Sequence, residues 1–265
     1  MNLQERVEGY RARGIQLLDA EILVLIEESA VALFHAFSDH FILFGGASLV
    51  LFHESPRLSR DLDLLVSPGQ LPNPKEIQDV VRSGIQPVAE TFGLGQLEFK
   101  EDVETPSIVK QWILANHKPL FSIDLTTIGG TVLESQIVKH TIAGRPEKTV
   151  LTLSANYLLY QKCETFLNRR FVKTRDAFDI YLLRSRGAAL QKTLHAHLQD
   201  FIAIKEFDKD FIDDRIQAVG SKLCTVELRP VLPQMLFKEL AREDFESVRR
   251  PLRTVFSDWL TKVRK

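Results

Sequence analysis

The order of hydrophobic and polar positions predicts alternating helices and strands in the first part of the chain. Apolar residues recur at spacings of three and four through residues 15–37, which predicts an amphipathic helix. A short apolar run at 41–44, ended by a glycine pair, predicts a buried strand, and residues 47–52 then favour a short helix. Polar and apolar residues alternate at the start of 61–66, as in a half-buried strand.

The pattern changes twice further along the chain. A helix is predicted at 75–92, ended or kinked where Gly84 and Pro87 fall. From residue 154 onward the spacing is helical. Between these helical parts the pattern predicts four strands, the first three antiparallel, at 95–103, 107–115, 120–127 and 134–142.

Together these elements predict an α/β (α+β) protein in two parts. Residues 1–150 should form a mixed sheet with flanking helices, and residues 151–265 a helical domain that completes the active-site cleft. A chain of 265 residues is long enough for one large domain or two modest ones.

Composition narrows the classes of protein that remain. The chain has 34 basic and 35 acidic residues, a net charge of −1, and 45% hydrophobic residues. This balance excludes a disordered chain and a uniformly basic nucleic-acid coat, so any nucleic-acid surface must be local. Two cysteines cannot build a disulfide framework or a cysteine-based zinc site. No run approaches the ~20 apolar residues of a membrane span, so a cytoplasmic protein without membrane contact is expected.

The first candidate for chemistry is a set of carboxylates beside the glycine pair. Asp61 and Asp63 are two residues apart on a predicted strand, so both side chains point to one face. Paired carboxylates repel each other unless a cation lies between them, and Mg²⁺ prefers such oxygen ligands together with substrate phosphates. Gly45 and Gly46 would let a phosphate approach the backbone and the positive end of the following helix. With Asp124 on another strand, the pattern predicts a two-metal phosphoryl-transfer site, with metals ~4 Å apart.

A structural alternative remains open for each of these residues. An Asp-x-Asp pair also occurs on solvated strand faces, and a glycine pair before a helix is a weak signal on its own. The apolar flanks and the order of glycine pair, Asp-x-Asp and third Asp strengthen the catalytic interpretation without excluding the structural one.

The second candidate lies in the helical part, at residues 157–186. This segment holds seven basic and three acidic residues, a net charge of +4 in a chain of −1. Asp176 and Asp179 are neighbours on one helix face. These charges could form a buried structural network. In the alternative interpretation they form a nucleotide-binding wall, where Lys162 meets a triphosphate and Asp176 orients Lys162 or a base.

These motifs resemble the AbiEii/AbiGii-type nucleotidyltransferase toxins, within the DNA polymerase beta-like nucleotidyltransferases. The shared pattern is Gly-Gly-x-x-Leu, Arg-x-Ser-x-Asp-Leu-Asp, a third Asp, then Lys followed by Arg-Asp-x-x-Asp. It covers segments 41–66, 121–127 and 157–186, and leaves most of 190–265 unmatched.

The resemblance implies roles for individual residues. Asp61 and Asp63 match the family's metal-binding carboxylates, with Asp124 as the third acidic position. Lys162 and Asp176 fall on its catalytic motif in the helical part. Residues expected to contact the nucleotide are Gly45, Gly46, Ser48, Arg57, Ser59, Lys162, Lys173 and Arg175.

One position departs from the family pattern. The family usually has Ser or Thr directly after the glycine pair, whereas this chain has Ala47 there and Ser48 one residue later. One residue on a helix is a rotation of about 100°, so Ser48 can face away from a phosphate. A first-turn structural role for Ser48 is the alternative.

The resemblance implies a Mg²⁺-dependent enzyme that moves a nucleoside monophosphate (NMP) from a nucleoside triphosphate (NTP) to RNA, such as the tRNA 3′ end. It also implies the toxin of a toxin–antitoxin system, with a cognate antitoxin as partner. Asp124 would bind a second metal or accept the proton of the attacking hydroxyl. Two alternatives remain: a protein or small-molecule acceptor, and a protein of the same fold that binds a nucleotide without turnover.

Overall fold

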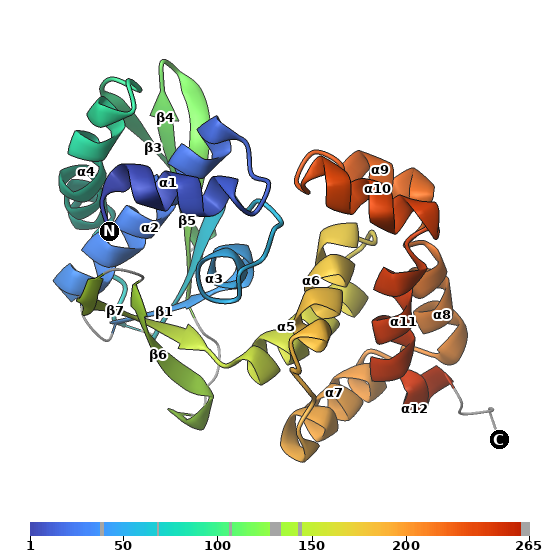
Figure 1. Cartoon of the computed structure of the whole chain (residues 1–265). Helices are drawn as coiled ribbons and strands as arrows, with labels where there is room; N and C mark the ends of the chain where they lie inside the picture. Colours follow the sequence, from blue (N-terminus) through green and yellow to red (C-terminus); the bar gives the residue numbers. More distant parts are fainter. Residues whose placement is uncertain (38–39, 68, 106–107, 128–133, 143–144, 261–265) are drawn as a thin grey trace. The chain divides into compact units, whose positions relative to one another are not determined.

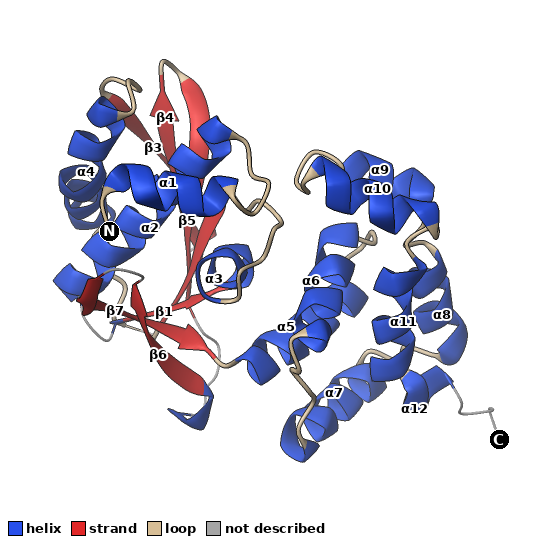
Figure 2. Ribbon diagram, in the orientation of Figure 1, coloured by secondary structure: helices blue, strands red, loops and turns tan. Residues whose placement is uncertain are grey.

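The chain divides into two compact units, each with its own core. The computed structural model describes residues 1–37, 40–67, 69–105, 108–127, 134–142 and 145–260. Unit 1 comprises residues 1–153 and unit 2 residues 154–265. Within the described residues, every strand belongs to unit 1 and unit 2 is built of helices (Figures 1 and 2).

Unit 1 combines one mixed sheet with four α-helices among its described residues. Its helices are α1 (Leu3–Arg11), α2 (Leu17–Phe37), α3 (Gly45–Phe52) and α4 (Pro74–Thr91), with a 3₁₀ turn at Glu134–Gln136. Its strands are β1 (Phe41–Phe44), β2 (Asp61–Val66), β3 (Leu97–Thr105), β4 (Ile108–Ala115), β5 (Lys118–Thr127), β6 (Ile137–Ile142) and β7 (Arg145–Leu153).

The seven strands lie in the order β3-β4-β5-β2-β1-β7-β6. β2 pairs in parallel with β5, and β1 in parallel with β7, whereas the other neighbours are antiparallel. The centre of the sheet is therefore formed by β1 and β2, which are consecutive in the chain, and by β5, which is distant from them in sequence. This arrangement brings the predicted carboxylate strands 61–66 and 120–127 side by side.

Helices α2 and α4 cover one face of the sheet. A β-carbon on Gly84 would lie 2.7 Å from the β-carbon of Ala32, so the glycine lets α4 pack closely against α2. The amide of Gln111 on β4 donates to the carbonyl of Pro74, the first residue of α4, at 2.7 Å. The face that carries Gln111 is therefore the one that α4 covers.

Strand register places the apolar core on that same face. Gln111 pairs with Ile123 across β4 and β5, and Ile123 pairs with Leu62 across β5 and β2. Ile123 and Leu62 are fully buried. Because side chains alternate along a strand, the residues between them point to the opposite face. That opposite face is the one that carries Asp61, Asp63 and Asp124.

Unit 2 consists of helices in its described part. They are α5 (Ala155–Asn168), α6 (Thr174–Ser185), α7 (Lys192–Ile204), α8 (Lys209–Gln217), α9 (Ser221–Glu227), α10 (Gln234–Arg242), α11 (Glu246–Val255) and α12 (Ser257–Leu260). Helix α6 packs against α5 and α11. Phe166 and Phe256, with ring centroids 6.2 Å apart, stack in the core, where Phe178 is also fully buried.

The predicted fold class is confirmed, and the differences are local. α4 does not end at Gly84 or Pro87 but continues through both to Thr91. α3 begins at Gly45 rather than at residue 47, so the glycine pair belongs to its first turn. The 134–142 strand begins at Ile137, after the 3₁₀ turn.

Two elements of unit 1 have no counterpart in the predicted pattern. α1 buries only Arg6, Val7 and Tyr10, which is too few apolar positions for a periodic signal, although Asn2 and Glu5 form a capping box. β7 begins with the polar sequence Arg-Pro-Glu-Lys, so only its second half has the apolar and β-branched residues that are typical of a strand. No helix among the described residues is long and apolar enough to span a membrane.

Candidate functional site

The junction between β1 and α3 is shaped by two glycines. Gly45 has φ +68°, a conformation that favours glycine, and a β-carbon there would overlap the carboxylate of Asp63. A β-carbon on Gly46 would overlap the Ser59 hydroxyl and lie 2.9 Å from Nη2 of Arg57. The glycine pair therefore lets the start of α3 lie directly against the β2 carboxylate and against the segment that leads into β2.

The other nucleotide-binding candidates of this junction are buried. Arg57 is 4% exposed and its guanidinium donates to the carbonyl of Leu58 at 3.1 Å. Ser59 is also buried. The Ser48 side chain, on α3, is fully buried, and its hydroxyl has no hydrogen-bond partner among the described residues. Arg57 and Ser59 thus support the glycine pair, whereas the Ser48 hydroxyl does not reach the surface in this structure.

Three carboxylates lie on one face of the central strands, which we call the carboxylate face. Asp61 and Asp63 alternate with the buried Leu62 on β2. Asp63 pairs in register with Asp124 on the parallel strand β5. Cross-strand partners share a face of the sheet, with β-carbons ~5 Å apart. The strand register therefore brings Asp124 next to the Asp-x-Asp pair.

The same face carries two partners that the sequence interpretation missed. The Ser122 hydroxyl donates to Oδ1 of Asp61 at 3.0 Å. Nζ of Lys110 lies 2.8 Å from Oδ2 of Asp124 and 4.8 Å from the ring centroid of Trp112. The spacing of Lys110 and Trp112 on β4 shows that they share a face of the sheet. It does not show which residues of β5 lie beside them, because that depends on the strand register.

The carboxylate face gathers three acidic side chains. Asp61, Asp63 and Asp124 lie together on it, and the ammonium of Lys110 lies against Asp124. Oδ1 of Asp124 is buried and has no hydrogen-bond partner among the described residues. A bound cation would relieve both features, because like charges on adjacent strands repel each other.

The donor set fits one divalent cation at the Asp-x-Asp pair. The described residues contain no cluster of three or more His, Cys, Asp or Glu side chains arranged to hold a metal. Mg²⁺ does not need such a cage, because it is bound by one or two carboxylates together with water and substrate phosphates. Asp61 and Asp63 supply that pair, whereas Asp124 has the Lys110 ammonium as its neighbour.

In unit 2, Lys162 of α5 is held by two aspartates of α6. Its Nζ lies 2.8 Å from Oδ2 of Asp179 and 3.5 Å from Oδ1 of Asp176. Nε of Arg169 lies 2.8 Å from the other carboxylate oxygen of Asp176. The side chains of Asp176 and Asp179 are 5% and 0% exposed. We call Lys162, Arg169, Asp176 and Asp179 the Lys162 network, in which two cations balance two anions.

The start of α6 is tied to α9. Glu227 accepts hydrogen bonds from the backbone N–H of Thr174 at 2.7 Å and from its hydroxyl at 3.1 Å. The same carboxylate lies 3.0 Å from Nζ of Lys173. Arg175 is exposed on the first turn of α6. Of the two predicted nucleotide contacts here, Lys173 is engaged by Glu227 and Arg175 points to solvent.

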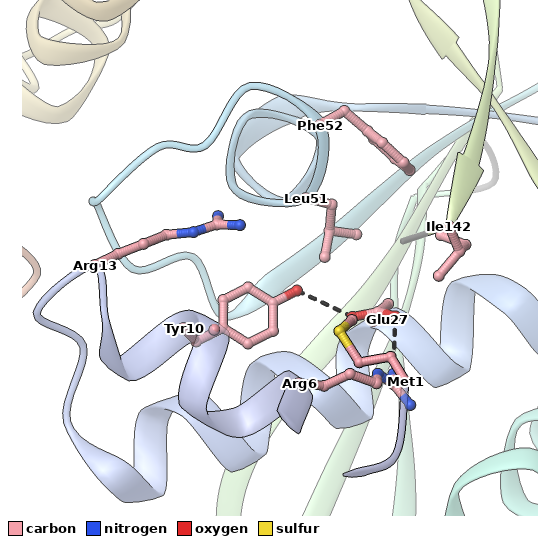
Figure 3. Close-up of a pocket in the computed structure, with 9 residues that line it drawn as sticks. Met1, Arg6, Tyr10, Arg13, Glu27, Leu51, Phe52 and Ile142 are labelled. Atoms are coloured by element: carbon pink, nitrogen blue, oxygen red, sulfur yellow. Dashed lines mark hydrogen bonds and ion pairs between the residues drawn. The ribbon is translucent and has the colours of Figure 1, made fainter. Parts of the chain in front are cut away.

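A separate ionic cluster of unit 1 lies beside a small pocket of about 80 Å³ (Figure 3). Arg6 of α1 contacts Glu28 of α2 and lies 2.9 Å from Glu27, and Arg145 of β7 also contacts Glu28. Tyr10 donates to Glu27 at 3.1 Å. The pocket is lined by Met1, Arg6, Gly9, Tyr10, Arg13, Glu27, Leu51, Phe52 and Ile142, none of them a predicted site residue.

Burial and pairing set the protonation of this cluster. Burial raises the pKa of Glu27 and, more strongly, that of Tyr10. Burial acts to raise the pKa of Glu28 too, but the hydrogen bonds from Arg145 and Arg6 outweigh it and hold that pKa below its usual value. The cluster ties α1 and β7 to α2, which is a role in folding.

Comparisons with known proteins converge on one family. The model of the family described as "Nucleotidyl transferase AbiEii toxin, Type IV TA system" matches residues 30–263. This match includes residues 190–263, where the motifs gave no indication. No curated protein matches the chain.

Two solved structures share the fold. One is a protein of H. pylori that is assigned as a nucleotidyltransferase, with TM-score 0.53 and 15% identity over 95% of this chain and 100% of that one. The other is JHP933 from Helicobacter pylori, with TM-score 0.50 and 15% identity over 88% of this chain and 91% of that one. At this identity the likeness concerns the fold.

Proposed function

The chain belongs to the AbiEii nucleotidyl transferase toxin family of type IV toxin–antitoxin systems, and we propose that it transfers an NMP unit from an NTP to an RNA acceptor. The observation that carries this proposal is the register of the sheet. It sets Asp63 beside Asp124, with Asp61 on the same face and Gly45 packed against the Asp63 carboxylate.

In this proposal Asp61 and Asp63 hold Mg²⁺, which supplies charge neutralisation for the triphosphate and for the charge that develops during transfer. The glycine pair lets the first turn of α3, whose N-cap residue Phe44 offers no side-chain cap, lie directly against the Asp63 carboxylate, so a phosphate bound through the cation would lie near the N–H groups of this turn. Ser122 orients Asp61 through its hydroxyl. These groups position the reacting phosphate.

Asp124 has two possible roles, in binding a second Mg²⁺ or in accepting the proton of the attacking hydroxyl. Its Oδ2 is held by Lys110, and its Oδ1 is the oxygen left to accept a proton or a ligand. Lys110 is then a positioning residue that neutralises Asp124 while substrate is absent. A second cation at Asp124 would bind through Oδ1, the oxygen that Lys110 does not contact.

In unit 2 we propose that Lys162 neutralises the triphosphate and that Asp176 positions it. The contacts add Asp179 to this assignment, because it is the nearer partner of the Lys162 ammonium. Held between two carboxylates, the Lys162 ammonium is fixed in position.

The partner is implied by the family, whereas the acceptor is part of our proposal. Membership in a type IV toxin–antitoxin family implies a cognate antitoxin. We propose RNA as the acceptor, such as the 3′ end of tRNA, with the reaction taking place in the cytoplasm, where tRNA and NTPs meet.

The test is incubation of the purified protein with each labelled NTP, Mg²⁺ and total tRNA. We expect label on RNA with at least one NTP, and none with Asp61→Asn or Asp63→Asn. Glu101→Gln, on the exposed edge strand β3, is the matched control and should retain activity. Absence of label with every NTP, or undiminished transfer by Asp61→Asn, would contradict the proposal. Label on a polypeptide or on a small molecule would instead identify another acceptor.

A further inference from the structure

The loop between α5 and α6 presents an exposed aromatic ring among cations. Phe171 is 66% exposed, although burying a phenylalanine side chain is normally favourable by ~2–3 kcal/mol. The guanidinium carbon of Arg170 lies 5.1 Å from the centroid of the Phe171 ring. The Phe171 ring is therefore exposed at the surface of unit 2, with the planar guanidinium of Arg170 beside it.

The charge of this segment faces outward. Residues 169–175 contain four cations and no carboxylate. Arg169 and Lys173 are engaged by Asp176 and Glu227, whose side chains are only 5% and 13% exposed. Arg170 and Arg175 are exposed and form no ion pair with a described residue. We call residues 169–175 the cationic loop.

The cationic loop is also held in place at its second end. Glu227 of α9 binds both the backbone N–H and the hydroxyl of Thr174 and contacts the Lys173 ammonium. Arg169, at the first end, is fixed to the buried Asp176. Pre-ordered groups lose little conformational entropy when a ligand binds them.

We propose that the cationic loop binds the RNA acceptor as a single strand, with a base stacked on Phe171 and phosphates paired with Arg170 and Arg175. This inference rests on the proposed function, because it names the surface that would hold the acceptor. Base–aromatic stacking combined with cations along the backbone is the usual way in which proteins bind single strands without sequence preference.

The combination of groups favours RNA over an acidic protein partner. A carboxylate-rich peptide would use the arginines but has no planar group in each residue to stack on Phe171. Double-stranded RNA keeps its bases stacked inside the helix, so it can use the arginines but not the ring. The loop should therefore prefer a single strand to a duplex of the same length.

The test is RNA binding by the full chain, measured by fluorescence anisotropy with a 5′-labelled single-stranded 12-mer. EDTA is present and NTP is absent, so that binding is measured independently of transfer. Phe171→Ala should weaken binding about 5- to 150-fold, which corresponds to the ~1–3 kcal/mol of base stacking. Ile204→Ala, at a 78% exposed position on α7, is the matched control and should leave binding unchanged.

A charge-removing pair tests the arginines. Arg170→Gln with Arg175→Gln should reduce the slope of log K against log salt by about 1.4, because each phosphate contact on a single strand contributes ~0.7. Lys192→Gln with Lys209→Gln, two exposed lysines on other helices of unit 2, should leave the slope unchanged. A duplex of the same sequence should show the arginine effect without the Phe171 effect.

Any of three results would overturn the inference: no RNA binding by the wild type, wild-type affinity in Phe171→Ala, or an equal loss in Ile204→Ala. If Phe171→Ala keeps wild-type RNA affinity but no longer binds the cognate antitoxin, the loop is assigned to a protein partner instead. The two proposals fail separately. If the wild type transfers no nucleotide while Phe171→Ala still loses RNA affinity, the transfer proposal falls and the RNA surface stands.

Discussion

The carboxylate face of unit 1 and the Lys162 network of unit 2 contain the same kinds of side chain but differ in how deeply their carboxylates are buried. The network matches two cations with two carboxylates, and both carboxylates are almost fully buried. The face groups three carboxylates, of which Asp124 is paired with Lys110 and has a side chain that is 22% exposed. Buried charges must be paired for a protein to fold, whereas carboxylates grouped at a partly exposed surface can bind a counter-ion.

This difference separates what each region contributes. The network is complete without a ligand, so its first effect is on the stability of unit 2, and any role toward a nucleotide adds to that. The carboxylate face is the proposed cation site, so its first effect is expected on binding and activity. Mutations should therefore separate the two regions, and the two tryptophans help: Trp112 reports on unit 1 and Trp259 on unit 2.

The largest effect on stability is expected for Asp179→Asn. Its carboxylate is fully buried against Lys162, and removing one partner of a buried ion pair costs about 3–5 kcal/mol. Urea unfolding followed by Trp259 fluorescence, in a Trp112→Phe background, measures the loss in unit 2. A change in the free energy of unfolding below 1 kcal/mol would show that the Lys162 network does not stabilise unit 2, which would contradict the difference drawn here between the two regions.

Glu28→Gln should have the next largest effect, about 2–3 kcal/mol, because Glu28 accepts hydrogen bonds from two arginines. The pKa of Glu28 is held below its usual value of 4.5, so its contribution to stability is present above pH 4.5 and is lost as pH falls through the folded-state pKa. Glu28→Gln should therefore flatten the acid side of the stability curve of unit 1, followed by Trp112 fluorescence.

Glu27→Gln is the control for this pH dependence. Burial raises the pKa of Glu27, so its contribution is present below the unfolded-state pKa and is lost as pH rises through the folded-state value. Glu27→Gln should change the stability of unit 1 above pH 4.5, and it should leave the loss of stability below pH 4.5, which depends on Glu28, as in the wild type. Identical pH profiles for the two variants would contradict the assignment of the arginine hydrogen bonds to Glu28.

A smaller effect is expected for Lys110→Met, which removes the ammonium that contacts Asp124. Stability should fall by about 1 kcal/mol, because a partly exposed ion pair contributes little. Mn²⁺ affinity, measured by electron paramagnetic resonance as a stand-in for Mg²⁺, should rise about 5-fold, since ~1 kcal/mol of repulsion between the cation and the ammonium is removed. Weaker Mn²⁺ binding would mean that Lys110 supports the cation site rather than opposing it.

The sequence predicts local features of this comparison better than distant ones. The alternation of Asp61 and Asp63 places both on one face without any knowledge of the fold, and the structure has them there. The neighbour of Asp63 on β5 depends on a strand register between segments about 60 residues apart, which no local pattern encodes. The lysine next to that neighbour lies on β4, whose register with β5 shifts between Ile113 and Leu114, an irregularity that the alternation of residues does not predict.

The helical part shows the same limit. The i,i+3 spacing of Asp176 and Asp179 predicts a shared face, but packing of α5 on α6 decides that Asp179 is the nearer partner of Lys162. Phe171 carries no periodic signal, because its importance lies in its exposure, which only the structure shows.

The most direct measurement is a pair of values for Asp63→Asn: its nucleotidyl transfer rate and its free energy of unfolding. Loss of this carboxylate should reduce transfer about 100- to 1,000-fold, as expected when a preorganised electrostatic group is removed, because the cation loses a ligand. The stability of unit 1 should change by no more than about 1 kcal/mol, because Asp63 is not fully buried and partly exposed charges contribute little to stability. Wild-type transfer, or loss of transfer together with unfolding of unit 1, would contradict the account.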